Sequence, residues 1–162
     1  MLSVAMMAAL ALAAPPAALP GAHSSGESYP IKVYFWRQSP GAPAAVTPVR
    51  RRSPDLQVAR YALEQLLAGP TERERAQGLR GGLRDALKGP SNCGQDFTVA
   101  IRRGALTVRF CRYVNTTTGT MMQVLPQLNA TLRQFPTVRR VILLTRDGHC
   151  TFTQRDGDHC LS

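Results

Sequence analysis

The sequence predicts an α+β domain in which a small mixed β-sheet carries two helices packed on one face. Apolar and polar residues alternate at strand spacing near 31–36 and on both sides of a turn between 97 and 111. Apolar residues recur at helical spacing in 56–67 and 121–135. Both helical stretches lie between strands and give long crossovers, so the predicted order is β-α-β-β-α-β plus a C-terminal hairpin arm.

The first predicted strand has two different faces. Its apolar face holds Ile31, Val33 and Phe35, and its opposite face holds Lys32, Tyr34 and Trp36. Residues 39–52 follow this strand and contain three prolines and the run Arg50-Arg51-Arg52. That composition predicts an exposed loop.

The first predicted helix spans about 54–68. Ser53-Pro54-Asp55 supplies an N-cap, a proline suited to the first helical position and an early acid. The apolar stripe of the helix consists of Leu56, Ala59, Leu63, Leu66 and Leu67. The helix ends at Gly69-Pro70, because glycine adopts the left-handed cap conformation and proline cannot continue the helix. Thr71 and Glu74 then form a capping-box pattern for a short helical turn.

The second predicted helix has apolar residues at spacings of four and three, namely Met121, Leu125, Leu128, Leu132 and Phe135. Pro126 interrupts this pattern, so the helix is expected either to start near Leu125 or to kink there. A strand at 138–145 follows, and its apolar run 141–144 occupies both faces, as in a strand that is covered on both sides or central in a sheet. A last arm is predicted at 151–153.

Two segments carry a more specific pattern. One is Leu66-Leu67-Ala68-Gly69-Pro70-Thr71, followed by Glu74 and Gly78-Leu79, and the other runs from Thr131 to Val141. Together with Val33-Tyr34-Phe35 and with Gly104 and Val108 in the middle strands, they closely resemble the GerMN domain, named from a bacterial sporulation and spore-germination lipoprotein. The resemblance covers roughly residues 31–152.

The resemblance implies a fold similar to the ring-building modules of secretion machines. It also implies a scaffold or accessory role in the cell envelope, linked in the namesake to sporulation. No catalytic residue is implied, and the motif positions are expected to be structural: Gly69, Pro70, Thr71, Glu74, Thr131, Leu132, Phe135 and Pro136. This chain differs in having one copy of the domain and no lipid-attachment cysteine.

The N-terminal residues predict export. Leu2 to Ala14 is apolar and uncharged, as in a secretory signal, although no basic residue precedes it. We expect a signal peptide at 1–22, with cleavage after Ala13 or Ala22, a flexible tether at 23–30 and a single domain at 31–162. Since no cysteine precedes Cys93, the exported protein is expected to be soluble outside the cytoplasm, with only peripheral membrane association.

Four cysteines suit an oxidising compartment. Residues 97–102 and 106–111 alternate around Arg103-Gly104, which predicts a β-hairpin that brings Cys111 near Cys93. The remaining cysteines flank a predicted turn, so the expected disulfides are Cys93 with Cys111 and Cys150 with Cys160. Zinc is the alternative for the last pair together with His149 and His159, but adjacent strand residues point to opposite faces, so we predict no metal.

The net charge of +10, from 20 basic and 10 acidic residues, favours anionic partners. Candidate anion-binding residues are Arg50, Arg51, Arg52, Arg139 and Arg140. Tyr34 and Trp36 are candidates for a protein contact. Export and the expected core positions of the phenylalanines argue against nucleic acid as the partner.

The sequence favours a non-enzymatic function without a cofactor. No Gly-x-Ser-x-Gly motif is present, and the closely spaced acids Glu72 and Glu74, like Asp156 and Asp158, lie in predicted turns. The leading interpretation is a non-catalytic, exported binding or scaffold module of the envelope, with an envelope protein or an anionic polymer as partner. The alternatives are a small secreted hydrolase and a charge-driven binder of anionic wall polymer or lipid head groups.

Overall fold

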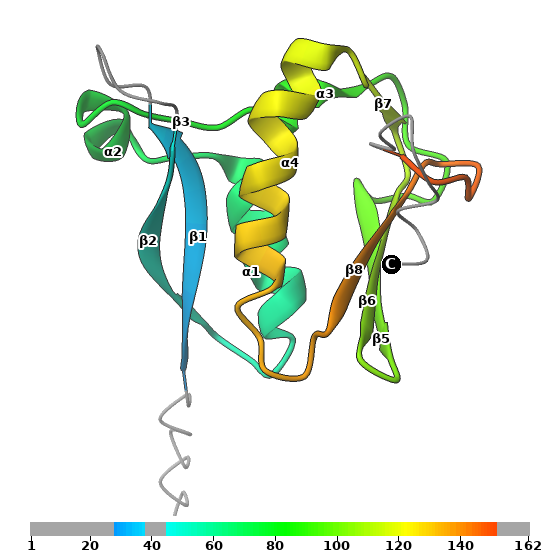
Figure 1. Ribbon diagram of the computed structural model, residues 1–162, viewed down its shortest axis with the longest axis horizontal. Coiled ribbons are helices and arrows are strands. Elements are labelled where there is room, and N and C mark those ends of the chain that lie inside the picture. Colours follow the sequence, from blue (N-terminus) through cyan, green and yellow to red (C-terminus); the bar gives the residue numbers. More distant parts are fainter. Residues whose placement is uncertain (1–27, 38–44, 152–162) are drawn as a thin grey trace, which may run out of the picture.

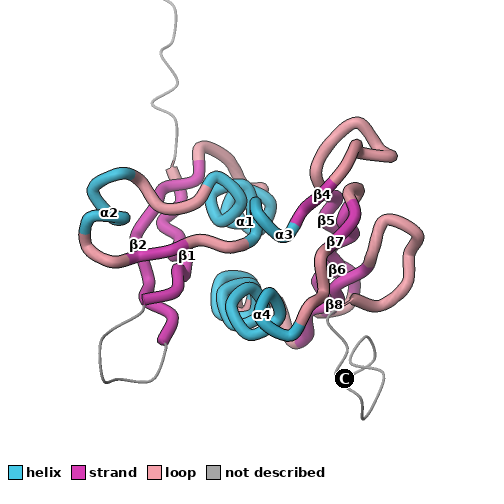
Figure 2. The backbone as a smooth tube through the Cα atoms, turned by 90° about the horizontal axis from the view of Figure 1, so that it is seen from above, coloured by secondary structure: helices cyan, strands magenta, loops and turns pink. Residues whose placement is uncertain are grey.

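Two three-stranded sheets enclose a layer of two helices in the computed structural model, which describes residues 28–37 and 45–151 (Figures 1 and 2). The first sheet has the order β2-β1-β3, with β1 at Tyr29–Arg37, β2 at Ala45–Ser53 and β3 at Leu79–Arg80. The second has the order β5-β6-β8, with β5 at Phe97–Arg102, β6 at Ala105–Phe110 and β8 at Arg140–Leu144. The layer between them consists of α1 at Val58–Ala68 and α4 at Thr118–Leu132. The short elements are α2 at Glu72–Ala76, α3 at Leu83–Ala86, β4 at Leu87–Lys88 and β7 at Tyr113–Val114.

The α+β class is confirmed, and so is the mixed sheet. β5 and β6 pair antiparallel, whereas β6 and β8 pair parallel. The expectation of one main sheet is wrong, because β1 does not join this sheet. It pairs with β2 along all nine of its residues, from Tyr29 opposite Ser53 to Arg37 opposite Ala45.

The loop predicted at 39–52 is wrong from Ala45 onward, because these residues form β2. β2 is an edge strand, where a proline such as Pro48 is tolerated because one side of the strand needs no hydrogen-bond donor. Exposed Arg50 and Arg52 also suit an edge, since charge discourages pairing with another chain. A segment rich in proline and arginine is therefore compatible with an edge strand as well as with a loop, and its composition does not distinguish the two.

Helix α1 begins four residues later than predicted, at Val58. Ser53 is the buried last residue of β2, and its hydroxyl donates to the carbonyl of Asp55 at 2.9 Å. The Asp55 carboxylate accepts from the backbone N–H of Gln57 at 2.7 Å, so the segment forms a turn ahead of the helix. Leu56 consequently lies outside the helix and is 77% exposed, although the sequence pattern places it on the apolar stripe.

Helix α4 continues through Pro126, so the predicted start near Leu125 is wrong. Its buried residues are Val124, Gln127, Leu128, Thr131 and Leu132. Met121, Leu125 and Phe135 are only partly buried against this core. The buried stripe is displaced from the predicted one because α4 uses two polar residues, Gln127 and Thr131, on its inner side.

One continuous apolar core joins both sheets to the helix layer. The inward residues of β1 are Ile31, Val33 and Phe35, as predicted, and those of the central strand β6 are Leu106, Val108 and Phe110. From the helices, Leu63, Leu66, Leu128 and Leu132 are almost completely buried in the same cluster. β8 lies at the edge of its sheet, not at the centre as its apolar sequence suggests.

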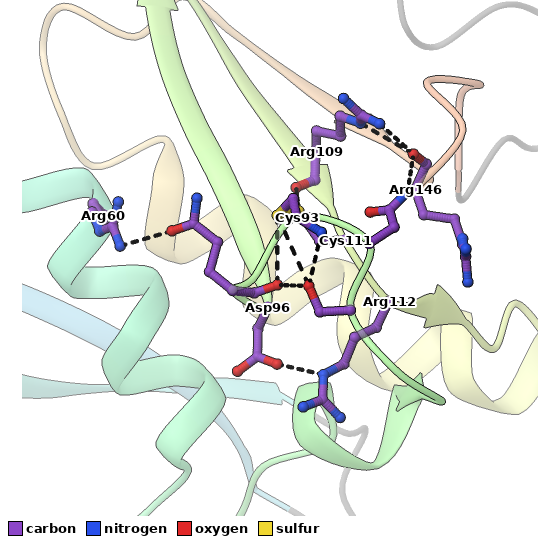
Figure 3. The surroundings of a disulfide bond; sticks show 10 residues. Arg60, Cys93, Asp96, Arg109, Cys111, Arg112 and Arg146 are labelled. Carbon is purple, nitrogen blue, oxygen red and sulfur yellow. Dashed lines mark hydrogen bonds and ion pairs between the residues drawn. A yellow bond between two sulfur atoms is a disulfide. The ribbon is translucent and has the colours of Figure 1, made fainter.

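The predicted hairpin and its disulfide are confirmed (Figure 3). Arg103 and Gly104 make the turn with φ of 50° and 79°. Cys93 and Cys111 are bonded, with their Cα atoms 5.7 Å apart. Cys150 is disulfide-bonded as well; its predicted partner Cys160, like residues 1–27, lies outside the described part of the chain.

Helix α2 is tied to β2 by a partly buried ion pair. Thr71 and Glu74 form the predicted capping box, in which Glu74 accepts from the backbone N–H of Thr71 at 2.8 Å. Both carboxylate oxygens of Glu74 also accept from Arg51, at 2.8 and 2.7 Å. These hydrogen bonds from Arg51 lower the pKa of Glu74 from 4.5 to about 2, although burial acts in the opposite direction.

We predict that Glu74→Gln destabilises the protein by about 1–3 kcal/mol near neutral pH, because it removes hydrogen bonds between charged groups. The folded pKa lies below the unfolded value, so this stabilisation is complete above about pH 4.5 and is lost as the pH falls toward about 2. Urea unfolding of the wild-type protein and of Glu74→Gln between pH 7 and about 2 measures this difference in the free energy of unfolding. Glu72→Gln, at an exposed acid of the same helix, is the control. A difference that stays constant from pH 7 down to about 2 would contradict the assigned role of Glu74.

Loss of the Cys93–Cys111 bond should cost about 2–4 kcal/mol, because it closes a loop with a sequence separation of 18 residues. The test is chemical unfolding of Cys93→Ala/Cys111→Ala. Peptide mapping of the oxidised protein should link these two cysteines. A link from either one to Cys150 would refute the assignment.

Candidate functional site

The outer face of the β1–β2 sheet is the strongest candidate for a binding surface. Ile31, Val33 and Phe35 are buried toward the helices, so the alternate residues of β1 face the other way. Residues opposite one another in an antiparallel pair share a face, which places Tyr34 beside Pro48 and Trp36 beside Val46. The same register places Lys32 beside Arg50 and Pro30 beside Arg52. We call these eight residues the outer face: Pro30, Lys32, Tyr34, Trp36, Val46, Pro48, Arg50 and Arg52.

One half of the outer face is apolar. Tyr34 and Trp36 are both half-buried, and Val46 is half-buried beside them. Partly exposed aromatic rings combine a large apolar surface with a polar group, a combination typical of protein contacts. The structure therefore brings together the two residues that the sequence offered as a partner contact.

The other half of the outer face is cationic. Lys32 and Arg50 lie directly opposite one another, an arrangement of like charges that disfavours folding unless solvent or an anion screens it. Among the residues that the structure describes, neither they nor Arg52 make an ion pair with an acid. Arg52 instead donates to the hydroxyl of Ser28 at 2.7 Å. A pocket of about 540 Å³ opens here, lined by Pro30, Ile31, Lys32, Arg50, Arg51, Arg52 and Gln134.

Thr131 of α4 and Gln134, just after this helix, fix the part of β1 that β3 leaves unpaired, beside this pocket. The Gln134 side-chain amide accepts from the backbone N–H of Lys32 at 2.7 Å and donates to the carbonyl of Lys32 at 2.6 Å. The Thr131 hydroxyl accepts from the backbone N–H of Tyr34 at 3.0 Å. These side chains take the place of a neighbouring strand and hold the backbone of the outer face in position. Gln134 was not predicted from the sequence; the available signal was its spacing of three from Thr131, just after the end of α4.

The predicted anion-binding arginines do not form one group. Arg51 lies on the inward side of β2 and is engaged by Glu74, so Arg50 and Arg52 remain on the outer face. Arg139 and Arg140 lie at the start of β8, in the sheet on the other side of the helix layer (Figure 2).

The motif residues have structural positions, with two exceptions. Gly69 follows α1 with φ of 82°, Pro70 is buried, and Thr71 and Glu74 form the capping box. Thr131 and Leu132 are buried in α4. Phe135 and Pro136 instead line an open groove with residues of α1 and β5.

The described histidine, cysteine and acidic residues do not form a metal-binding group. His149 is exposed in a turn, where its backbone N–H donates to the Thr145 hydroxyl at 3.2 Å. No three residues among the described His, Cys, Asp and Glu are placed to hold a metal ion, and His159 lies outside this part of the chain. None of the helices in residues 28–37 and 45–151 has the length and apolarity that crossing a bilayer requires.

Known structures share this fold. The tandem GerMN domains of the sporulation protein GerM from Bacillus subtilis match with a TM-score of 0.55 and 19% identity, over 79% of this chain and 42% of that one. The first GerMN domain of the same protein matches with a TM-score of 0.51 and 20% identity, over 80% of this chain and 90% of that one. The chain thus spans less than half of the tandem-domain structure.

A comparison with curated protein sequences finds no match. The family model Germane, described as sporulation and spore germination, matches residues 32–149 and so covers most of the chain. The chain belongs to the Germane family.

Proposed function

We propose that this domain is a non-catalytic binding or scaffold module that acts, after export, on a protein partner in the cell envelope. The observation that carries the proposal is the apolar half of the outer face, where Tyr34 and Trp36 lie side by side in register with Val46 and Pro48. Hydrogen bonds from the side chains of Thr131 and Gln134 to the backbone of β1 keep this surface preformed, which reduces the entropy lost on binding.

The expectation of export rests on the apolar N-terminal run and on cysteine usage. Disulfides such as Cys93–Cys111 persist in oxidising compartments and are rare in the cytosol. The GerM domains that share this fold come from a sporulation protein, which makes sporulation or germination the first process in which to look for a partner.

A second candidate function is charge-driven binding of an anionic wall polymer. The observation that favours it is the cationic half of the outer face, where the opposed Lys32 and Arg50 would both be stabilised by a phosphate or carboxylate group. Arg52, the next residue of β2 that points outward, would contribute a further positive charge.

Partner binding should be lost in Tyr34→Ala/Trp36→Ala, because partly buried aromatic residues commonly contribute about 2 kcal/mol or more each to an interface. The experiment is cross-linking in intact envelopes, identification of the partner, and measurement of Kd with the two purified proteins. Tyr113→Ala, at an exposed tyrosine outside the outer face, is the matched control.

Salt and charge variants separate the two candidates. Binding to a protein partner should persist from low to physiological salt and should tolerate Arg50→Gln/Arg52→Gln. Binding to an anionic polymer should weaken as salt increases and should be lost in the arginine variant. Binding that is unaffected by the aromatic and the arginine variants would refute the placement of the site on the outer face.

A further inference from the structure

A second surface lies at one end of the molecule, next to the cationic half of the outer face and away from its aromatic half. Three connections meet there, at the lower edge of Figure 1: the segment between β2 and α1, the turn between β5 and β6, and the segment between α4 and β8. We call this surface the loop end, and it consists of residues 53–57, 101–105 and 133–140.

The loop end contains an open apolar groove of about 360 Å³. Leu56 and Ile101 both line it, together with Val99, Phe135 and Pro136. Leu56 is 77% exposed and Ile101 is 47% exposed, which places both among the large hydrophobic residues that the described surface leaves in water.

The exposure of Ile101 follows from the fold. Ile101 is opposite the buried Leu106, so it points to the same side of the sheet as the core. Phe97, Val99 and Ile101 share that side, and their burial decreases in this order toward the turn. The groove is therefore a continuation of the apolar core that opens to solvent beside the first residues of α1.

Arginines are concentrated on the same three segments, although none of them lines the groove itself. The three segments of the loop end contain five arginines and one acid, Asp55; the arginines are Arg102, Arg103, Arg133, Arg139 and Arg140, and all five are exposed. Segments 101–105 and 133–140 are held together, because the Arg139 backbone N–H donates to the carbonyl of Gly104 at 2.8 Å. The Arg139 side chain also packs over Gly104, 3.2 Å from where a Cβ would lie.

We propose that the loop end docks peripherally on an anionic lipid bilayer. Leu56 and Ile101 would enter the boundary between head groups and acyl chains, and the arginines would contact lipid phosphates, as in other interfacial protein surfaces. A wall polymer would satisfy the arginines but would leave the aliphatic side chains without a partner, so a bilayer fits both features.

The orientation of the chain agrees with this docking. β1 starts at Tyr29 at the same end of the molecule (Figure 1). In this orientation β1 leads away from the bilayer, and the aromatic residues of the outer face remain accessible to a partner.

The test is flotation with phosphatidylglycerol and phosphatidylcholine vesicles. The chain from His23 onward, the predicted exported form, is used because residues 2–14 would bind vesicles by themselves. We expect binding to phosphatidylglycerol only, weakened about tenfold or more in Leu56→Ser/Ile101→Ser because two aliphatic side chains no longer leave water. Tyr113→Ser/Met122→Ser is the matched control, since these residues are 60% and 70% exposed outside the loop end.

Charge is tested with Arg102→Gln/Arg139→Gln, which should weaken binding, against Arg73→Gln/Arg84→Gln on α2 and α3, which should not. Leu56→Trp in a Trp36→Phe background should show a blue-shifted emission on phosphatidylglycerol vesicles.

Three results would each overturn the proposal: no binding to phosphatidylglycerol, equal losses in test and control variants, or binding that is indifferent to Leu56→Ser/Ile101→Ser and is reproduced by soluble anionic polymer. The outer-face variants Tyr34→Ala/Trp36→Ala should leave vesicle binding intact, so this test and the test of the proposed function can fail separately.

Discussion

The layer of two helices is the constraint on which the rest of this structure depends. No strand of the β2-β1-β3 sheet pairs with a strand of the β5-β6-β8 sheet in the described chain, so α1 and α4 set the relation between the sheets. A helix placed between two sheets must be apolar over a wide arc, which explains why Leu63, Leu66, Leu128 and Leu132 are all almost completely buried. Removing one of these leucines would weaken a layer on which both sheets pack.

Polar bonds from the helices give this layered core its register. A purely apolar stripe allows α4 to slide along β1, whereas the reciprocal bonds between Gln134 and Lys32 fit at one position only. In the neighbouring edge strand β2, Arg51 bonds Glu74 and so ties this strand to the capping box of α2. The part of β1 that β3 leaves unpaired is thus held by Thr131 and Gln134, and β2 is held by α2, which keeps the outer face preformed.

Local patterns in the sequence predicted the elements that rest on local physics. The capping box at Thr71 and Glu74, the turn at Arg103-Gly104 and the alternation in β1 each depend on residues a few positions apart. The β2 strand could not be predicted in this way, because its prolines and arginines are acceptable only at a sheet edge, which is a tertiary property. Tyr34 and Trp36 could be predicted as a pair because they follow from the local alternation in β1. The contribution of Gln134 could not, because its contact with Lys32 depends on the fold.

The two candidate surfaces differ in how the fold creates them. The outer face is the unburied side of a sheet whose other side is core, so its character follows from strand alternation and is visible in the sequence. The loop end exists because the core side of β5 opens to solvent beside the first residues of α1 and leaves Ile101 exposed, an arrangement that no single segment reveals. A surface of this second kind keeps core-like side chains in water, and exposed apolar patches of this sort commonly mark interaction sites. The proposed anionic bilayer would accommodate both the exposed aliphatic residues and the arginines on the same segments.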